Sequence, residues 1–238
     1  MMIRELTALD EFDAFSQLEA RIWGATDPTP RSLLVVFSRH GGVVLGAYDR
    51  GQLVGISLGF PGLDEDGRTY LHSHVLGVVM EYRGRGVGQA LKRAQWTYAE
   101  RAGLPYVGWT FDPLMAQNAW FNLAVLGAEV ADVLENAYGS LNDAINGTAP
   151  THRLWVRWNP QKPPRRQNGG DEALMAIPAN VETLRRQDPH RARTQQEEFF
   201  QEISARWQAG WRIDGVVRQE GQVWYRWVKT ARESGRGS

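Results

Sequence analysis

The chain has 238 residues, of which 42% are hydrophobic and 23% charged, as in one large globular domain or a domain with a substantial extension. Lys plus Arg and Asp plus Glu both number 27, so the formal net charge is zero, which argues against a nucleic-acid binder. The absence of cysteine excludes disulfides, thiolate catalysis and cysteine-based zinc sites. No apolar run suits a membrane span, and the first residues lack the apolar core of a signal peptide. We therefore expect a cytoplasmic protein with no membrane partner and no metal.

The first part of the chain alternates strand and helix patterns. Asp10 is expected to cap the first helix, whose apolar residues recur at helical spacing. The turn sequence Asp49-Arg50-Gly51-Gln52 predicts a hairpin between two strands. The expected elements are a strand at 2–7, helices at 10–23 and 31–40, and strands at 43–48, 53–60 and 70–79.

The second part begins with a glycine-rich loop and an amphipathic helix. The expected elements are a helix at 86–102, a strand at 106–111, a helix capped by Asp112 and ending before Gly127, and strands at 129–134 and 153–158. Together these complete a predicted domain over 1–159. A Pro- and Gly-rich linker is expected at 160–171, then an extension at 172–230 and a disordered tail at 231–238. A helix at 191–209 and strands at 211–217 and 223–228 are expected in the extension.

The loop between the strand at 70–79 and the next helix has the composition of an anion-binding site. Positive-φ glycines and unpaired helix N-terminal amides suit a pyrophosphate. The spacing fails the dinucleotide fingerprint, because Gln89 or Leu91 stands where the last glycine is needed. It also fails the P-loop pattern. The motif that fits is R-x-x-G-x-G, at Arg83, Gly86 and Gly88.

This motif, with the order of elements around it, resembles the GNAT superfamily of acyl-CoA-dependent N-acyltransferases over roughly residues 2–158. The resemblance implies an α/β fold (α+β in some schemes), with a mixed, mostly antiparallel sheet flanked by helices. Here a C-terminal helix–hairpin extension follows. The co-substrate would be acetyl-CoA or succinyl-CoA, and the acceptor a small-molecule amine.

Further motifs resemble a bacterial GNAT subgroup with a C-terminal extension, some of whose members are linked to N-acylamino-acid racemases. That link implies an amino acid as acceptor. The motifs are Trp109-Thr110-Phe111-Asp112-Pro113-Leu114, Asn118-Ala119-Trp120-Phe121-Asn122-Leu123, Leu126-Gly127-Ala128, Tyr138-Gly139, Asn142-Asp143 and the strand at 153–158.

The resemblance also implies which residues bind coenzyme A. The loop would hold the pyrophosphate, the preceding strand would pair with the pantetheine arm, and the helix after Pro113 would lie beside the cofactor. Lys92 and Arg93 lie about two turns along the helix after the loop. The cofactor-binding residues predicted in this way are Leu76, Gly77, Val78, Val79, Arg83, Gly84, Arg85, Gly86, Val87, Gly88, Asn118 and Phe121.

Acyl transfer needs a neutral amine, and an amine of pKa about 10.4 loses about 4–5 kcal/mol in being deprotonated at pH 7. A general base is therefore expected. His72 and His74 share one strand face, and His72 lies near where many relatives carry a glutamate. Either could be the base, with His72 slightly preferred; both could instead be structural.

Many relatives carry a tyrosine, acting as the acid, where this chain has Leu123. Tyr138 or a water could replace this missing tyrosine. The absence of the family tyrosine also supports an alternative function, a CoA-binding sensor without catalysis. The long segment from 135 to 152 could form the acceptor pocket, with Asn142 in it and Arg153 pairing with a substrate carboxylate. Tryptophans in the extension indicate either its core or a subunit contact in a homodimer. They are Trp207, Trp211, Trp224 and Trp227.

Overall fold

The computed structural model describes residues 1–24, 27–139, 150–162 and 170–229. The chain divides into two compact units, the first ending at Trp109 and the second beginning at Thr110. Each unit has its own buried hydrophobic core. The predicted domain boundary near residue 160 stays a prediction. Residues 163–169 of the predicted linker, the predicted tail and Asn142 lie outside the described residues.

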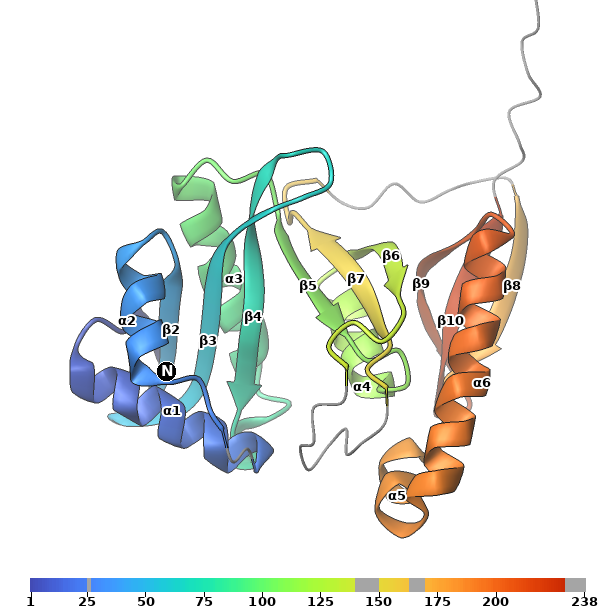
Figure 1. Ribbon diagram of the computed structural model, residues 1–238, viewed down its shortest axis with the longest axis horizontal. Helices are drawn as coiled ribbons and strands as arrows, with labels where there is room; N and C mark the ends of the chain where they lie inside the picture. Colours follow the sequence, from blue (N-terminus) through green and yellow to red (C-terminus); the bar gives the residue numbers. More distant parts are fainter. Residues whose placement is uncertain (25–26, 140–149, 163–169, 230–238) are drawn as a thin grey trace, which may run out of the picture. The chain divides into compact units, whose positions relative to one another are not determined.

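The first unit is built around a mostly antiparallel sheet (Figure 1). Its strands pair in the order β1-β2-β3-β4-β5, and only the β4–β5 pair is parallel. The predicted strands and helices of this part are confirmed. They are β1 (Met2–Glu5), α1 (Leu9–Trp23), α2 (Arg31–Arg39), β2 (Val43–Asp49), β3 (Gln52–Leu63), β4 (Thr69–Val78), the 3₁₀ turn η1 (Met80–Tyr82), α3 (Val87–Arg101) and β5 (Val107–Phe111), which runs on into the second unit.

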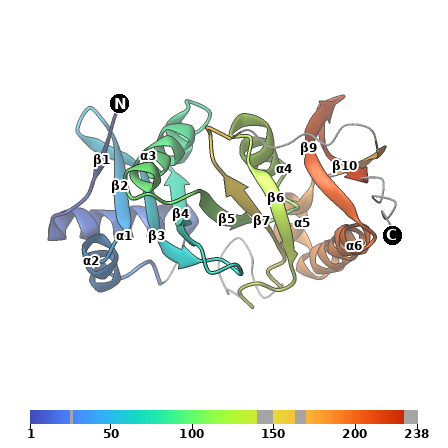
Figure 2. The ribbon, with the colours of Figure 1, turned by 90° about the horizontal axis from the view of Figure 1, so that it is seen from above.

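Helices cover both faces of this sheet. Figure 2 shows α3 on one side of β1–β4, and α1 and α2 on the other. Glycines in the strands let the helices approach closely: a Cβ at Gly55 would lie 3.2 Å from Leu91 of α3, and a Cβ at Gly77 only 2.4 Å from Trp23 of α1. β4 therefore has one face toward α3 and one toward α1 and α2, and a register shift at His74, between Ser73 and Val75, interrupts the alternation along the strand.

The start of α1 differs from the prediction. The helix begins at Leu9, and Glu11 rather than Asp10 caps it. One Glu11 carboxylate oxygen accepts hydrogen bonds from the backbone N–H groups of Thr7 (2.8 Å) and Ala8 (3.0 Å). The N-cap position is Ala8, so Asp10 lies inside the first turn, whereas a glutamate at the third helical position can reach back to the amides before the helix.

The described residues of the second unit form a hairpin, a three-stranded sheet and three α-helices. β6 pairs with β7, and the other sheet has the order β8-β10-β9. The elements are α4 (Ala116–Ala119), continued by the π-helix η2 (Trp120–Val125), β6 (Glu129–Leu134), β7 (Arg153–Trp158), β8 (Asp171–Ala176), α5 (Val181–Gln187), α6 (Pro189–Gln208), β9 (Trp211–Gln219) and β10 (Gln222–Lys229). The predicted helix and hairpin of the extension are present, and β8 and α5 are additional.

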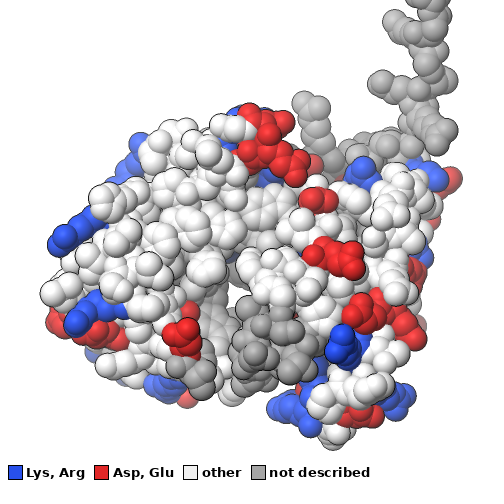
Figure 3. Space-filling model, viewed as in Figure 1, with Lys and Arg blue, Asp and Glu red and all other residues white. Residues whose placement is uncertain are grey.

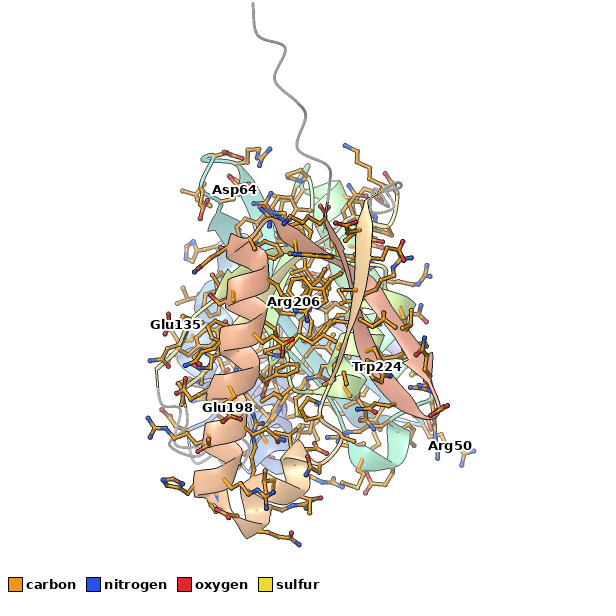
Figure 4. All side chains as sticks on the ribbon, turned by 90° about the vertical axis from the view of Figure 1, so that its right-hand side faces the viewer. Arg50, Asp64, Glu135, Glu198, Arg206 and Trp224 are labelled. Atoms are coloured by element: carbon orange, nitrogen blue, oxygen red, sulfur yellow. The ribbon has the colours of Figure 1, made fainter. Side chains whose placement is uncertain are left out.

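The extension has a core of its own. Figure 4 shows α6 beside this sheet, with Arg206 on the helix and Trp224 on a strand. Trp227 is completely buried, whereas Trp207, Trp211 and Trp224 are half-buried. Trp227 thus belongs to the core of the extension, and a subunit contact through the other three stays a prediction.

Asp112 does not cap a helix as predicted. Its side chain accepts a hydrogen bond from the Leu114 amide (2.9 Å), which closes a turn, and the helix begins only at Ala116. The other carboxylate oxygen forms an ion pair with Arg185 of α5 (2.7 Å). Among the described residues, no helix combines the length and apolar character needed to cross a bilayer.

Candidate active site

The glycine loop connects the end of β4 to the start of α3. Gly84 and Gly86 have φ values of 73° and 82°, which L side chains rarely adopt. The Arg83 side chain donates from Nε to the carbonyl of Val78 (3.1 Å), which ties the loop to the end of the strand. The Arg85 guanidinium lies 5.1 Å from the ring centre of Tyr82. The loop is therefore held at both of its arginines.

The start of α3 is arranged to receive an anion. Gly86 is the N-cap, so no side chain caps the helix, and the first turn has no acidic residue. A Cβ at Gly84 or Gly86 would meet nothing within 4 Å, so the space above the loop is open to a ligand. Arg83 and Arg85 are exposed beside it. Uncapped amides, the helix dipole and two guanidinium groups together suit a pyrophosphate.

The strand leading to this loop has an unpaired edge. β5 pairs with β4 only at Leu71 with Val107 and at His72 with Gly108. β4 continues to Val78, so from Ser73 onward this edge has no strand partner among the described residues. An extended chain bearing amides, such as a pantetheine arm, could add to such an edge by backbone hydrogen bonds. Leu76 and Val78 lie on this stretch, and Val79 follows it with its amide bonded to Val54.

The two predicted histidines lie together on the α1–α2 face of β4. Their ring centres are 6.1 Å apart. His72 is half-buried and its Nδ1 lies 3.3 Å from the hydroxyl of Tyr70, whereas His74 is exposed. Phe60 of β3 lies beside both imidazoles, with its ring centre 5.1 Å from His72 and 5.8 Å from His74.

The surroundings separate the two histidines electrostatically. Burial, together with electrostatic repulsion from His74 and Lys92 when they are protonated, lowers the pKa of His72 to about 4. Packing around the His74 ring also lowers its pKa, but the carboxylate of Glu19 acts in the opposite direction. Both side chains are neutral at pH 7, and His74 has the environment better suited to accepting a proton.

Lys92 does not lie beside the ligand loop. Its side chain is buried on the α3 side of the sheet, where Nζ donates to Ser73 Oγ (2.8 Å) and lies 3.4 Å from the ring centre of Trp109. Burial holds the pKa of Lys92 well below its usual value. The sequence pattern placed it only by distance along the helix. Its spacing of four and seven residues from the buried Trp96 and Ala99 could have indicated an inward direction.

The remaining predicted residues lie in the second unit. Asn118 is exposed on α4, Phe121 is half-buried in η2, and Leu123 is buried. The Tyr138 hydroxyl is 2.9 Å from Thr110 Oγ1, and the Arg153 guanidinium lies 5.8 Å from the Tyr138 ring centre. Arg153 is buried and donates to the carbonyl of His152 (2.9 Å), so it lies deeper than the pocket edge expected for it.

Sequence reasoning missed how the long segment after Glu135 is anchored. His152 is buried and stacks on Phe200 of α6 with ring centres 3.8 Å apart. Its Nδ1 accepts from the Asn136 amide (3.3 Å), and its Nε2 lies 3.2 Å from a carboxylate oxygen of Glu197. The contacts with α6 involve residues far apart in the sequence, so no local pattern could have indicated them.

The comparisons with known proteins agree with this geometry. The Acetyltransferase (GNAT) family matches residues 5–121. Among solved structures, NAA60 of Arabidopsis thaliana in complex with acetyl-CoA has 16% identity and a TM-score of 0.53, covering 66% of this chain and 97% of that chain. Aminoglycoside 6'-acetyltransferase type Ii has 20% identity and a TM-score of 0.52, and the match covers 69% of this chain and 100% of that chain. Naa20 of Chaetomium thermophilum in complex with a bisubstrate analogue has 16% identity and a TM-score of 0.53, and the match covers 66% of this chain and 86% of that chain.

No match was found among curated proteins. The identities to the solved structures are low, so these likenesses show a shared fold, whereas the family match rests on the sequence itself. The matched segment contains the meander, the glycine loop, α3 and both histidines. Residues 5–121 form a domain of the Acetyltransferase (GNAT) family, which identifies this domain as an acyl-CoA-dependent N-acyltransferase.

Proposed function

We propose that the protein transfers an acetyl or succinyl group from acyl-CoA to the primary amine of a small molecule, such as an amino acid. The observation that carries this proposal is the unpaired edge of β4, which leads into an uncapped helix start and has two imidazoles beside it. Donor and base elements thus follow one another within a single strand–loop–helix segment.

On the donor side, the pyrophosphate binds the loop residues, and the pantetheine arm pairs with the backbone of Leu76, Val78 and Val79. Asn118 and Phe121 provide additional contacts to the cofactor. The loop residues are Arg83, Gly84, Arg85, Gly86, Val87 and Gly88. The predominance of backbone contacts explains why glycine conformation matters more here than side-chain identity.

On the acceptor side, we assign the base to His74, directly or through one water. His72 is the less favourable candidate, since its pKa of about 4 makes it a weak base. The neutral amine attacks the thioester carbonyl, the new C–N bond forms, and the thiolate of coenzyme A leaves. A strand amide near Val78 stabilises the developing oxyanion.

Three residues of the second unit complete the proposal. Tyr138 is the candidate acid for the leaving thiolate, because Leu123 has no proton to donate and is buried. Arg153 and Asn142 are the candidates for a substrate carboxylate. A carboxylate on the acceptor is what would make an arginine useful there.

The test is a thiol-release screen that crosses acetyl-CoA and succinyl-CoA with L- and D-amino acids and simple amines. The proposal predicts amine-dependent release, with the acylated product identified by mass spectrometry. Tyr138→Phe and Arg153→Gln, assayed against the best acceptor, then separate an effect on kcat from an effect on KM. Coenzyme A binding without amine-dependent release by any acceptor would show a binding protein instead.

A further inference from the structure

We infer that the acceptor amine carries an apolar or aromatic group, and that this group binds a surface patch formed by Leu33, Val36, Phe37 and Phe60. This inference rests on the proposed function and specifies its substrate. The four residues, called the α2–β3 patch, come from α2 and from β3, and all belong to the first unit.

The patch adjoins the candidate base. Phe37 and Phe60 stack with ring centres 4.8 Å apart and an interplanar angle of 12°. Phe60 is in turn within 5.8 Å of the His74 ring, centre to centre. An amine positioned for deprotonation at His74 therefore has its substituent within reach of aromatic surface on the same face of the sheet.

The helix side of the patch is exposed. Leu33 and Val36 are 46% and 49% exposed, and with Phe37 they occupy positions i, i+3 and i+4 on one face of α2. Leu34, on the same helix, is completely buried. Large apolar side chains clustered beside a catalytic face are typical of a binding surface.

The charges nearby favour an acceptor with one amine and an uncharged body. Figure 3 shows that the central surface over β3 and β4 is largely free of Lys, Arg, Asp and Glu, with Lys or Arg side chains at the edge beside α2. Glu19 acts electrostatically on His74, and its carboxylate accepts hydrogen bonds from Thr29. Asp13 is paired with Arg31 (2.8 Å). Among the described residues of this face, few carboxylates are therefore available to bind a polycationic acceptor.

The experiment compares kcat/KM for acceptors that share an amine and differ in the attached group. The series is glycine, alanine, leucine and phenylalanine as free amino acids, the matching simple amines, and the aminoglycoside kanamycin as a polycation. We expect phenylalanine or leucine to exceed alanine by about 10- to 200-fold, the range over which apolar groups change kcat/KM in enzyme pockets. Kanamycin should be the poorest acceptor.

The patch itself is tested by the double variant Leu33→Ser/Val36→Ser, with Leu174→Ser as the matched control because Leu174 is 40% exposed in the other unit. The double variant should raise KM for the apolar acceptor about 10-fold or more and leave KM for acyl-CoA unchanged. The control should change neither.

The outcomes separate the two proposals. Turnover with equal kcat/KM across the series, a preference for kanamycin, or an unchanged KM in the double variant would overturn the α2–β3 patch and leave the acyltransferase proposal standing. Absence of turnover with every amine, while coenzyme A still binds, would overturn both. An apolar preference that the double variant weakens supports the inference.

Discussion

The proposed donor segment and the proposed acceptor face of this enzyme are built in different ways. The proposed donor segment is one continuous stretch, from β4 through the glycine loop to α3, and we propose that it binds the donor largely through backbone groups. The acceptor face combines side chains from α1, α2, β3 and β4. A site made of backbone groups depends on the φ and ψ angles of a few residues in one segment. A site made of side chains from several elements depends on how those elements pack together. The following changes are ordered from the largest expected effect to the smallest.

Removing the base should have the largest effect and leave the donor segment intact. His74→Ala is expected to lower kcat by about 100- to 10,000-fold, the usual contribution of a general base. His72→Ala should have a smaller effect, because its low pKa makes it the weaker base. Steady-state kinetics measures kcat, and calorimetric titration measures the affinity for coenzyme A. A loss of coenzyme A affinity parallel to the loss of kcat would show that the two regions are not separable; the exposed His40→Ala is the control.

His72 should also make stability depend on pH. Its folded-state pKa of about 4 lies below the ordinary 6.5, so between these values the unfolded chain binds a proton that the folded chain does not. The free energy of unfolding should therefore fall as pH decreases from 6.5 to 4. The upper limit is roughly 3 kcal/mol at 1.36 kcal/mol per pKa unit.

Urea unfolding at several pH values measures this dependence. His72→Gln should flatten the curve in that window, whereas the matched variant His40→Gln should not. An unchanged slope in His72→Gln would contradict the buried, neutral state of this imidazole.

A backbone change in the glycine loop should affect the donor segment alone. Gly86→Ala forces an L side chain into the left-handed region at φ 82°. The strain of about 1–2 kcal/mol should appear as a coenzyme A affinity lower by roughly 5- to 30-fold, because the loop relaxes away from its binding conformation.

Gly67→Ala is the matched control, since Gly67 has φ 74° and open space around it but lies in the turn between β3 and β4. It should lose a similar amount of stability without losing affinity. Equal affinity losses in both variants would contradict the assignment of the loop.

The smallest effect is expected where α6 anchors the segment after Glu135. Glu197→Ala removes the carboxylate beside Nε2 of the buried His152 and should lower the free energy of unfolding by about 1 kcal/mol. Chemical unfolding measures it, with the exposed Glu198→Ala as control. A loss of several kcal/mol would show that the contact between α6 and His152 is a major determinant of the second unit's stability.

The same contrast explains what could be read from the sequence. The strands and helices of the first unit and the glycine loop were predictable, because glycines, turns and apolar periodicity are local signals. The pair His72 and His74 was placed on one face by alternation alone. Phe37 and Phe60 were not recognised, since their stacking depends on how α2 packs on β3.

Other differences have similar causes. The cap of α1 differs from the prediction because the Glu11 side chain reaches back to the amides before the helix. The Asp112 side chain pairs with Arg185, which lies 73 residues later in the chain. β8 and α5 were missed because their short, mixed sequences carry no strong periodicity. Apart from the cap of α1, which is local, each of these differences involves interactions between residues far apart in the sequence.

The most direct test of the central claim is a measurement of free thiol released from acetyl-CoA by the wild-type protein and by His74→Ala, with and without an amine acceptor. The account predicts release that requires the amine, yields one acylated product per thiol, and falls by about 100-fold or more in His74→Ala while coenzyme A affinity is retained. Thiol release unaffected by the amine, or turnover unchanged in His74→Ala, would contradict the proposed chemistry of this face.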